Sequence, residues 1–95
     1  MAALNISFRH GQAWEAARAN FEKGISTAQT RYGAYIRRVD WSEDRTSAQL
    51  SGSGFDIRVW LDEEAVHATG EVPFFAQYLL KAPVRHFFEE TFHGP

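Results

Sequence analysis

The chain has 95 residues, a formal net charge of -2 and no cysteine. This length allows one domain over residues 1–95, and 44% apolar with 23% charged residues is typical of a globular protein. The lack of cysteine excludes disulfides and thiol chemistry. The near-balanced charge gives no electrostatic basis for nucleic-acid binding. No apolar run approaches the ~20 residues of a membrane span, and the first residues turn polar too soon for a signal peptide, so we expect a cytoplasmic protein.

A strand and a long helix are the first predicted elements. Residues 4–9 alternate between apolar and polar side chains, which favours a strand. Gly24 lies beside the apolar side of the helix that follows, and we interpret it as a point of close approach to a sheet. The helix is predicted over residues 12–32 because apolar residues recur there every three or four positions, at Trp14, Ala17, Phe21, Ile25, Ala28 and Tyr32.

Four strand-like segments follow, separated by polar or glycine-rich turns, at residues 35–41, 46–51, 55–61 and 66–72. With a two-residue connection at Glu63-Glu64, Trp60 lies opposite His67 on the outer face of the sheet. In the same register, Arg58 lies opposite Thr69. Glu-Glu is, however, a poor pair for a turn of this kind.

The last segment, residues 73–92, is predicted to be helical. Pro73 suits the first turn of a helix, whereas Pro83 removes a hydrogen bond from a helix interior. We therefore expect a kink or break near residues 81–82, giving two short helical pieces. The whole pattern predicts an α+β domain in the order β-α-β-β-β-β-α. Its antiparallel sheet is covered on one face by the long N-terminal helix and a kinked C-terminal helix.

This C-terminal segment carries more aromatic surface than one helix face can bury. Neighbouring residues on a helix point about 100° apart, so the members of an adjacent pair of phenylalanines cannot face the same side. We expect the surplus to form an interaction surface, most simply in a homodimer. The predicted surface residues in this segment are Phe74, Phe75, Tyr78, Phe87 and Phe88.

A second candidate surface lies on the outer face of the predicted sheet. Trp60 and His67 form its centre, flanked by Arg58 and by Arg37 if the strands bring it near. A tryptophan beside cationic groups can stack on a flat or anionic ligand. Alternatively, the pair only stabilises the hairpin, as cross-strand pairs ordinarily do.

No residue set amounts to a catalytic signature, so we expect no enzyme and no cofactor. Gly52-Ser53-Gly54 precedes a strand rather than a helix, which indicates a turn and not a phosphate loop. Nothing in the sequence places a base beside a nucleophile, and Asp62, near a strand end, is expected to be merely solvated. One helical segment has the spacing of zinc ligands, at His86, Glu89, Glu90 and His93. A solvated helix face is, however, the plainer interpretation of these residues.

Several short motifs together resemble a known family. They are I-x-F-x-H at Ile6, Phe8 and His10, the helix opening Trp14-Glu15-Ala16-Ala17-Arg18, G-x-x-P at residues 70–73, and Leu79-Leu80-Lys81-x-Pro83. Over residues 5–92 the chain resembles the small bacterial family of polyhydroxyalkanoic acid system proteins, named for genes near polyester-storage genes. The resemblance implies a cytoplasmic protein associated with storage granules or their regulation. It implies no catalytic residues.

The sequence therefore predicts a non-enzymatic domain that acts through a hydrophobic surface, as a homodimer or at a polyester granule, where a Phe-rich amphipathic helix can adsorb. A third reading, a metal-dependent enzyme, would use His86, Glu89 and His93. The main alternative is a small-molecule binding module with an apolar pocket between the long helix and the concave face of the sheet. The residues predicted near the mouth of that pocket are Trp14, Phe21, Phe55 and Trp60.

Overall fold

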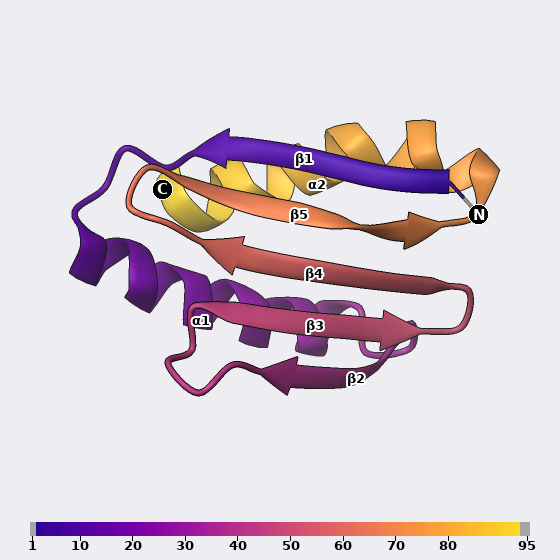
Figure 1. Cartoon of the computed structure of the whole chain (residues 1–95), viewed down its shortest axis with the longest axis horizontal. Coiled ribbons are helices and arrows are strands. Elements are labelled where there is room, and N and C mark those ends of the chain that lie inside the picture. The colour runs from indigo at the N-terminus through magenta and orange to yellow at the C-terminus, as the bar shows by residue number, and fades with distance from the viewer. Residues whose placement is uncertain (1, 94–95) are drawn as a thin grey trace.

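A sheet with helices on one face is the architecture of the chain (Figure 1). The computed structural model describes the backbone of residues 2–93 and the side chains of residues 2–73 and 82–92. Within these residues the elements are β1 (Ala2–Arg9), α1 (Trp14–Arg31), β2 (Ile36–Trp41), β3 (Ser47–Gly52), β4 (Phe55–Leu61), β5 (Ala65–Val72) and α2 (Phe74–His93). The predicted α+β class and the order β-α-β-β-β-β-α are confirmed.

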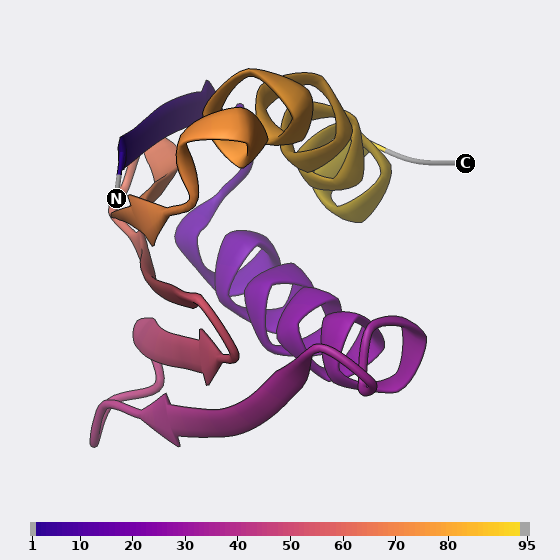
Figure 2. The same ribbon diagram turned by 90° about the vertical axis from the view of Figure 1, so that its right-hand side faces the viewer.

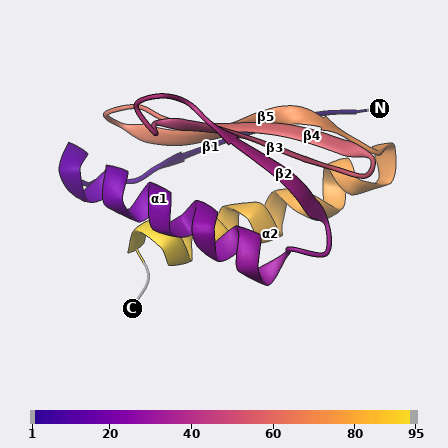
Figure 3. The same ribbon diagram turned by 90° about the horizontal axis from the view of Figure 1, so that it is seen from below.

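The strands are antiparallel to their neighbours and lie in the order β1-β5-β4-β3-β2. Strands β1 and β2 are consecutive along the chain but lie at opposite edges, and α1 connects them. Figure 2 shows the sheet curving around α1, with α2 also on the inner side. Figure 3 shows both helices below the sheet. The outer face of the sheet is therefore left uncovered by the described helices.

The hairpin of β4 and β5 has the predicted register, with Trp60 opposite His67. Its two-residue connection is stabilised by Asp62, whose Oδ1 accepts hydrogen bonds from the backbone N–H groups of Glu64 at 2.8 Å and Ala65 at 2.7 Å. An aspartate at this position supplies the acceptor that the turn would otherwise lack. The connection forms for this reason, even though Glu-Glu alone is a poor turn pair.

Helix α1 buries the middle of its predicted apolar stripe but not its end. Tyr32 follows the helix and is 42% exposed. Gly24 is buried, but it faces Thr91 of α2 rather than the sheet, and a β-carbon at position 24 would lie 2.6 Å from Thr91 Cγ2. The expectation of close approach to a sheet is therefore wrong, and the small residue serves helix–helix contact. The buried apolar side chains of α1 are Ala17, Phe21 and Ile25.

Helix α2 runs from Phe74 to His93 with Pro83 inside it, so the expected division into two helical pieces is wrong. An interior proline costs ~3 kcal/mol in a helix. Phe88 and Phe92, after the proline, are buried in the core. Burial of each ring contributes about 1.5–3 kcal/mol, which is enough to offset the proline and to fix the direction of the helix after it.

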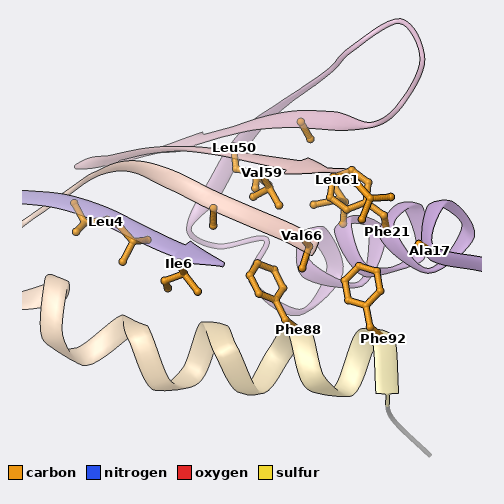
Figure 4. Packing of buried hydrophobic residues seen from close by; sticks show 14 residues of the cluster. Leu4, Ile6, Ala17, Phe21, Leu50, Val59, Leu61, Val66, Phe88 and Phe92 are labelled. Atoms are coloured by element: carbon orange, nitrogen blue, oxygen red, sulfur yellow. The ribbon is translucent and has the colours of Figure 1, made fainter. Parts of the chain in front are cut away.

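The core lies between the concave face of the sheet and the two helices (Figure 4). Strands β1, β3, β4 and β5 contribute alternate residues to this layer, as expected for a sheet with one buried face, whereas β2 has a register shift between Ile36 and Arg38. Figure 4 shows Phe88 and Phe92 of α2 directed toward Val66 of β5. In this view Phe21 of α1 is drawn on the other side of Val66 from these two rings. The remaining labelled members are Leu4, Ile6, Ala17, Leu50, Val59 and Leu61.

Candidate functional site

The candidate site lies on the uncovered outer face of the sheet, in a row that crosses three strands. Ser7 of β1 is opposite His67 of β5, and His67 is opposite Trp60 of β4. The immediate neighbours of each residue along its strand belong to or pack against the core, so the alternation of a strand turns the three side chains outward. This row brings Trp60 and His67 together as predicted.

Ser7, His67 and Asp62 form a continuous hydrogen-bonded chain. Ser7 Oγ lies 2.8 Å from His67 Nδ1, and His67 Nε2 lies 2.7 Å from Asp62 Oδ2. An ionised carboxylate only accepts hydrogen bonds, so Nε2 carries the ring proton and the Nδ1 lone pair accepts the Ser7 hydroxyl in the neutral imidazole. The structure thus places a base beside a hydroxyl, which the sequence did not indicate.

Asp62 is half-exposed but tightly engaged. Its side chain is 52% exposed, yet it accepts hydrogen bonds from His67 and from two backbone N–H groups. The hydrogen bond from His67, followed by those from Ala65 and Glu64, lowers the pKa of Asp62 from 3.8 to about 2. The expectation that this carboxylate is merely solvated is wrong. It is ionised at neutral pH and fixed in position.

His10 holds the loop that carries Asp62 from the inner side. It is only 1% exposed, and its Nδ1 accepts the backbone N–H of Gln12 at 3.0 Å. Its Nε2 therefore carries the ring proton and donates to the Asp62 carbonyl oxygen at 3.0 Å. The His10 backbone N–H also donates to the Glu64 carbonyl oxygen at 3.2 Å. The buried His10 thus holds the backbone of the β4–β5 connection by two hydrogen bonds, and this connection carries the Asp62 side chain that faces His67.

Arg58, Trp60 and His67 form the cluster that we call the Trp60 patch. The Trp60 and His67 rings are stacked, with centroids 5.0 Å apart and an interplanar angle of 24°. The Arg58 Cζ atom lies 5.6 Å from the centroid of the Trp60 ring. Arg37 does not join them, because it lies in β2 and β3 separates that strand from β4. The predicted cluster therefore forms with one arginine.

Among the described side chains, Arg58 has no ion-pair partner. On the same face, Arg38 Nε pairs with Asp40 Oδ2 at 2.7 Å. The acidic neighbour of Arg58 along β4, Asp56, instead accepts hydrogen bonds from Gln49 and Ser51. Among the side chains that the structure describes, none places a carboxylate within ion-pair distance of the exposed Arg58 guanidinium.

The predicted aromatic surface of α2 is divided between the core and the exterior. Phe88 is buried, at 6% exposure. Phe87 is half-buried, and its ring meets Tyr32 edge-on with centroids 6.4 Å apart. Sequence reasoning missed Tyr35, which is 69% exposed beyond the end of α1. Three of the predicted residues have side chains outside the described part of the chain: Phe74, Phe75 and Tyr78.

A groove of about 360 Å³ lies between α1 and α2, not between α1 and the sheet. Its lining is largely polar and includes Asn20, Lys23 and Thr27. Of the residues predicted at the mouth of an apolar pocket, Phe21 is buried against Trp41, with ring centroids 5.9 Å apart. Trp60 lies on the opposite face of the sheet. These two side chains therefore do not line a common pocket.

Two of the four side chains with zinc-ligand spacing on α2, His86 and Glu90, contact each other. His86 Nε2 lies 2.8 Å from Glu90 Oε1, and Glu90 Oε2 lies 3.8 Å from Arg31. The side chain of His93 lies outside the described residues. Within the described residues, no three histidine, aspartate or glutamate side chains come together in a group that could hold a metal ion.

Over the residues described, neither helix combines the length and the apolar content that crossing a membrane requires. Comparisons of the chain with models of protein families, with curated proteins and with solved structures return no match. The resemblance to the polyhydroxyalkanoic acid system family therefore stays a prediction, and the geometry of the outer face is the basis for a functional proposal.

Proposed function

We propose that the chain is a binding domain that holds a small planar anion, such as an aromatic carboxylate, on the Trp60 patch. One observation carries this proposal: the exposed Arg58 guanidinium lies 5.6 Å from the Trp60 ring centroid and, among the described side chains, has no carboxylate partner. An arginine beside an aromatic ring presents both a flat surface and a fork of donors for a carboxylate. A ligand that is both flat and anionic uses both.

The expected affinity is low, because the face is open. An aromatic contact contributes about 0.5–1.5 kcal/mol and a hydrogen bond to a charged group about 1.5–3 kcal/mol. Their sum is at most close to the ~4 kcal/mol that corresponds to a dissociation constant of ~1 mM. Binding should therefore be measured at ligand concentrations in the millimolar range, by a method that locates the site.

The test is a titration of labelled protein with benzoate, followed by the amide resonances in nuclear magnetic resonance spectra. We expect saturable shifts centred on Arg58, Trp60 and His67. Benzamide, which is flat but neutral, and cyclohexanecarboxylate, which is anionic but not flat, should each bind at least about 5-fold more weakly, because each lacks one of the two contacts.

The matched variants are Arg58→Gln and Arg38→Gln. Both remove an arginine from the outer face, but the Arg38 charge is already paired with Asp40. Arg58→Gln should abolish the benzoate shifts, whereas Arg38→Gln should leave them unchanged. Equal losses in the two variants, or equal binding of benzoate and benzamide, would contradict the proposal.

The second candidate keeps the predicted mode of action, a hydrophobic surface in a cytoplasmic homodimer or at a polyester granule. It differs in its residues: of the predicted α2 side chains that the structure describes, only the half-buried Phe87 belongs to it. The observation that favours it is a group of aromatic residues just beyond α1 and on α2: Tyr35 is 69% and Tyr32 42% exposed, and Tyr32 contacts the half-buried Phe87 of α2. We call the group of Tyr32, Tyr35 and Phe87 the tyrosine rim. Exposed aromatic rings at one place are typical of an interaction surface.

Sedimentation and adsorption to polyester particles test this candidate. Tyr35→Glu should lower self-association or particle binding, whereas Ser53→Glu, which adds the same charge to an exposed turn, should not. Phe88 is unsuitable for this test, because a charge at a buried position unfolds the chain rather than altering its surface. If both the wild type and Tyr35→Glu are monomeric and neither binds the particles, the tyrosine rim is not a functional surface.

A further inference from the structure

We infer that Ser7 is a nucleophile, activated by His67 and oriented by Asp62, that accepts the acyl group of an activated ester. The inference rests on the two distances in the chain of side chains: 2.8 Å from Ser7 Oγ to His67 Nδ1 and 2.7 Å from His67 Nε2 to Asp62 Oδ2. Both lie within the 2.6–3.2 Å range in which a base takes a proton from a nucleophile and a third group orients the base.

The arrangement of protons suits this role. Asp62 accepts a hydrogen bond from Nε2–H, so the Nδ1 lone pair is directed at the Ser7 hydroxyl and can receive its proton when the oxygen attacks. Serine proteases use the two ring nitrogens in the opposite sense, with Nε2 toward the serine. The roles depend on geometry rather than on which nitrogen fills them, and the imidazolium that forms is stabilised by the carboxylate in either case.

Ser7 and His67 are held by strands, and Asp62 is held by its hydrogen bonds within the β4–β5 connection. Ser7 lies on β1 next to the buried Ile6, and His67 lies on β5 between Val66 and Ala68, which are at most 1% exposed. The His67 ring is also stacked on Trp60. Side chains on well-packed strands keep their geometry without reorganisation at the moment of reaction. The His67 side chain remains 21% exposed, so substrate and water can reach it.

The reaction is an acyl transfer followed by hydrolysis. Ser7 Oγ bonds to the carbonyl carbon while its proton passes to His67 Nδ1. The bond from that carbon to the leaving oxygen then breaks, and the aryl oxide takes up the proton that His67 Nδ1 had received from Ser7. Solvent water attacks the acyl-serine with His67 again as base, which releases a carboxylic acid and restores Ser7. Because the face is open, the expected substrate is a small ester whose aryl oxide leaves readily.

Side-chain donors beside Ser7 on its own strand face are our candidates for stabilising the developing oxyanion. Asn5 and Arg9 stand two residues before and after Ser7 on β1, about 7 Å away along the strand. Both are exposed, and Arg9 makes a long ion pair of 4.0 Å with Glu64. A side-chain amide or guanidinium near the carbonyl oxygen is a known means of stabilising a tetrahedral intermediate.

The first experiment measures release of nitrophenolate from p-nitrophenyl acetate and locates the acetyl group by mass spectrometry. We expect acetylation of Ser7 and a rate at least ~10-fold above that of Ser7→Ala. The matched control is Ser47→Ala, since Ser47 lies in the same row, opposite Trp60, and should be dispensable. Asp62→Asn should reduce the rate to a similar extent as Ser7→Ala. Acetyl groups found only on lysine or on His67, at a rate that Ser7→Ala does not change, would overturn the inference.

A second experiment does not depend on turnover. The chain has no cysteine, so Ser7→Cys and Ser47→Cys each introduce a single thiol. A thiol beside His67 forms its thiolate more readily, and the thiolate is the reactive species. Iodoacetamide should therefore alkylate Cys at position 7 at least ~10-fold faster than Cys at position 47, and Asp62→Asn should reduce this advantage. Equal alkylation rates would show that His67 does not activate the group at position 7.

The two proposals for the outer face can fail separately. Arg58→Gln removes the binding of benzoate but leaves the hydrogen bonds of Ser7 intact, so acetylation of Ser7 should persist in that variant. Loss of acetylation in Arg58→Gln together with retained benzoate binding would contradict both assignments.

Discussion

Gly24 of α1 lies against Thr91 of α2 so closely that a β-carbon at position 24 would stand 2.6 Å from Thr91 Cγ2. This contact sets the separation of the two helices. Alanine favours a helix over glycine by ~1 kcal/mol, but overpacking at a tight contact costs about 1–3 kcal/mol. The net effect of the two is a loss of up to ~2 kcal/mol, so we expect Gly24→Ala to lower the free energy of unfolding by ~1 kcal/mol, measured by urea denaturation.

The control for this prediction is the same substitution in a Thr91→Ala background. Removal of the threonine methyl group and hydroxyl makes room for the new β-carbon, so Gly24→Ala should there be neutral or stabilising by up to ~1 kcal/mol. An equal cost in both backgrounds would mean that the contact with Thr91 does not determine the choice of glycine.

Gly70→Ala should be more damaging than Gly24→Ala. A β-carbon at position 70 would meet the Asp56 carbonyl oxygen and lie 2.7 Å from Ile57 Cα, both in the backbone of β4. A backbone cannot rotate away as a side chain can, so the pairing of β4 with β5 must shift. We expect a loss of at least ~3 kcal/mol in the free energy of unfolding. Thr69→Ala, on the neighbouring residue of the same strand, should cost about 1 kcal/mol; a similar cost for both would refute the explanation.

Phe88 and Phe87 are adjacent and should differ in their effect on stability. Phe88 is 6% exposed in the core, whereas Phe87 is half-buried beside Tyr32. Truncation of a buried phenylalanine to alanine costs about 3–5 kcal/mol, a large part of the stability of a small domain. We therefore compare Phe88→Leu with Phe87→Leu and expect losses of ~1–2 and less than ~1 kcal/mol. If calorimetry shows a larger loss of stability for Phe87→Leu than for Phe88→Leu, the assignment of Phe88 rather than Phe87 to the core is contradicted.

The carboxylate of Asp62 should make stability depend on pH in the acid range. Its pKa is about 2 in the folded chain against an ordinary 3.8, so its contribution is present above pH ~4 and is lost as the pH falls through ~2. A shift of this size corresponds to ~2.4 kcal/mol, but a side chain that is 52% exposed is screened by solvent, and we expect ~1 kcal/mol or less.

Urea denaturation at pH 5 and pH 2.5, on the wild type and on Asp62→Asn, measures this contribution. The pKa of Asp44 is also lowered, chiefly by the hydrogen bond from the Thr46 side chain, so the wild type has more than one acid-sensitive group. Only the difference between the two chains reports Asp62. The wild type should lose more stability between the two pH values than Asp62→Asn does, and parallel losses would contradict the assignment.

The sequence was sufficient for the β4–β5 hairpin because its signals are local. Alternation of apolar and polar residues together with a short connection fixes which residues face each other, so the pairing of Trp60 with His67 is predictable. The role of Asp62 was also open to inference: an aspartate before a poor turn pair is a common source of the missing hydrogen bonds.

The position of Ser7 could not be predicted in the same way. Ser7 and His67 are 60 residues apart, and no local pattern states that β1 borders β5 rather than β2. Likewise, the sequence shows that Phe87 and Phe88 point in different directions, but not which of them faces the core. That choice depends on how α1 and α2 lie beside each other, which is a property of the assembled tertiary structure.

The order of the strands has a consequence for synthesis of the chain. Strand β1 leaves the ribosome well before β5, its neighbour in the sheet, which ends at Val72. Strands β2 to β5 can pair with one another as soon as they are synthesised, while the edge of β5 that β1 occupies in the folded chain is still unpaired. The N-terminal strand of a second molecule can occupy that edge equally well. Refolding at high protein concentration should therefore yield strand-exchanged dimers, in which the serine of one molecule meets the histidine of the other.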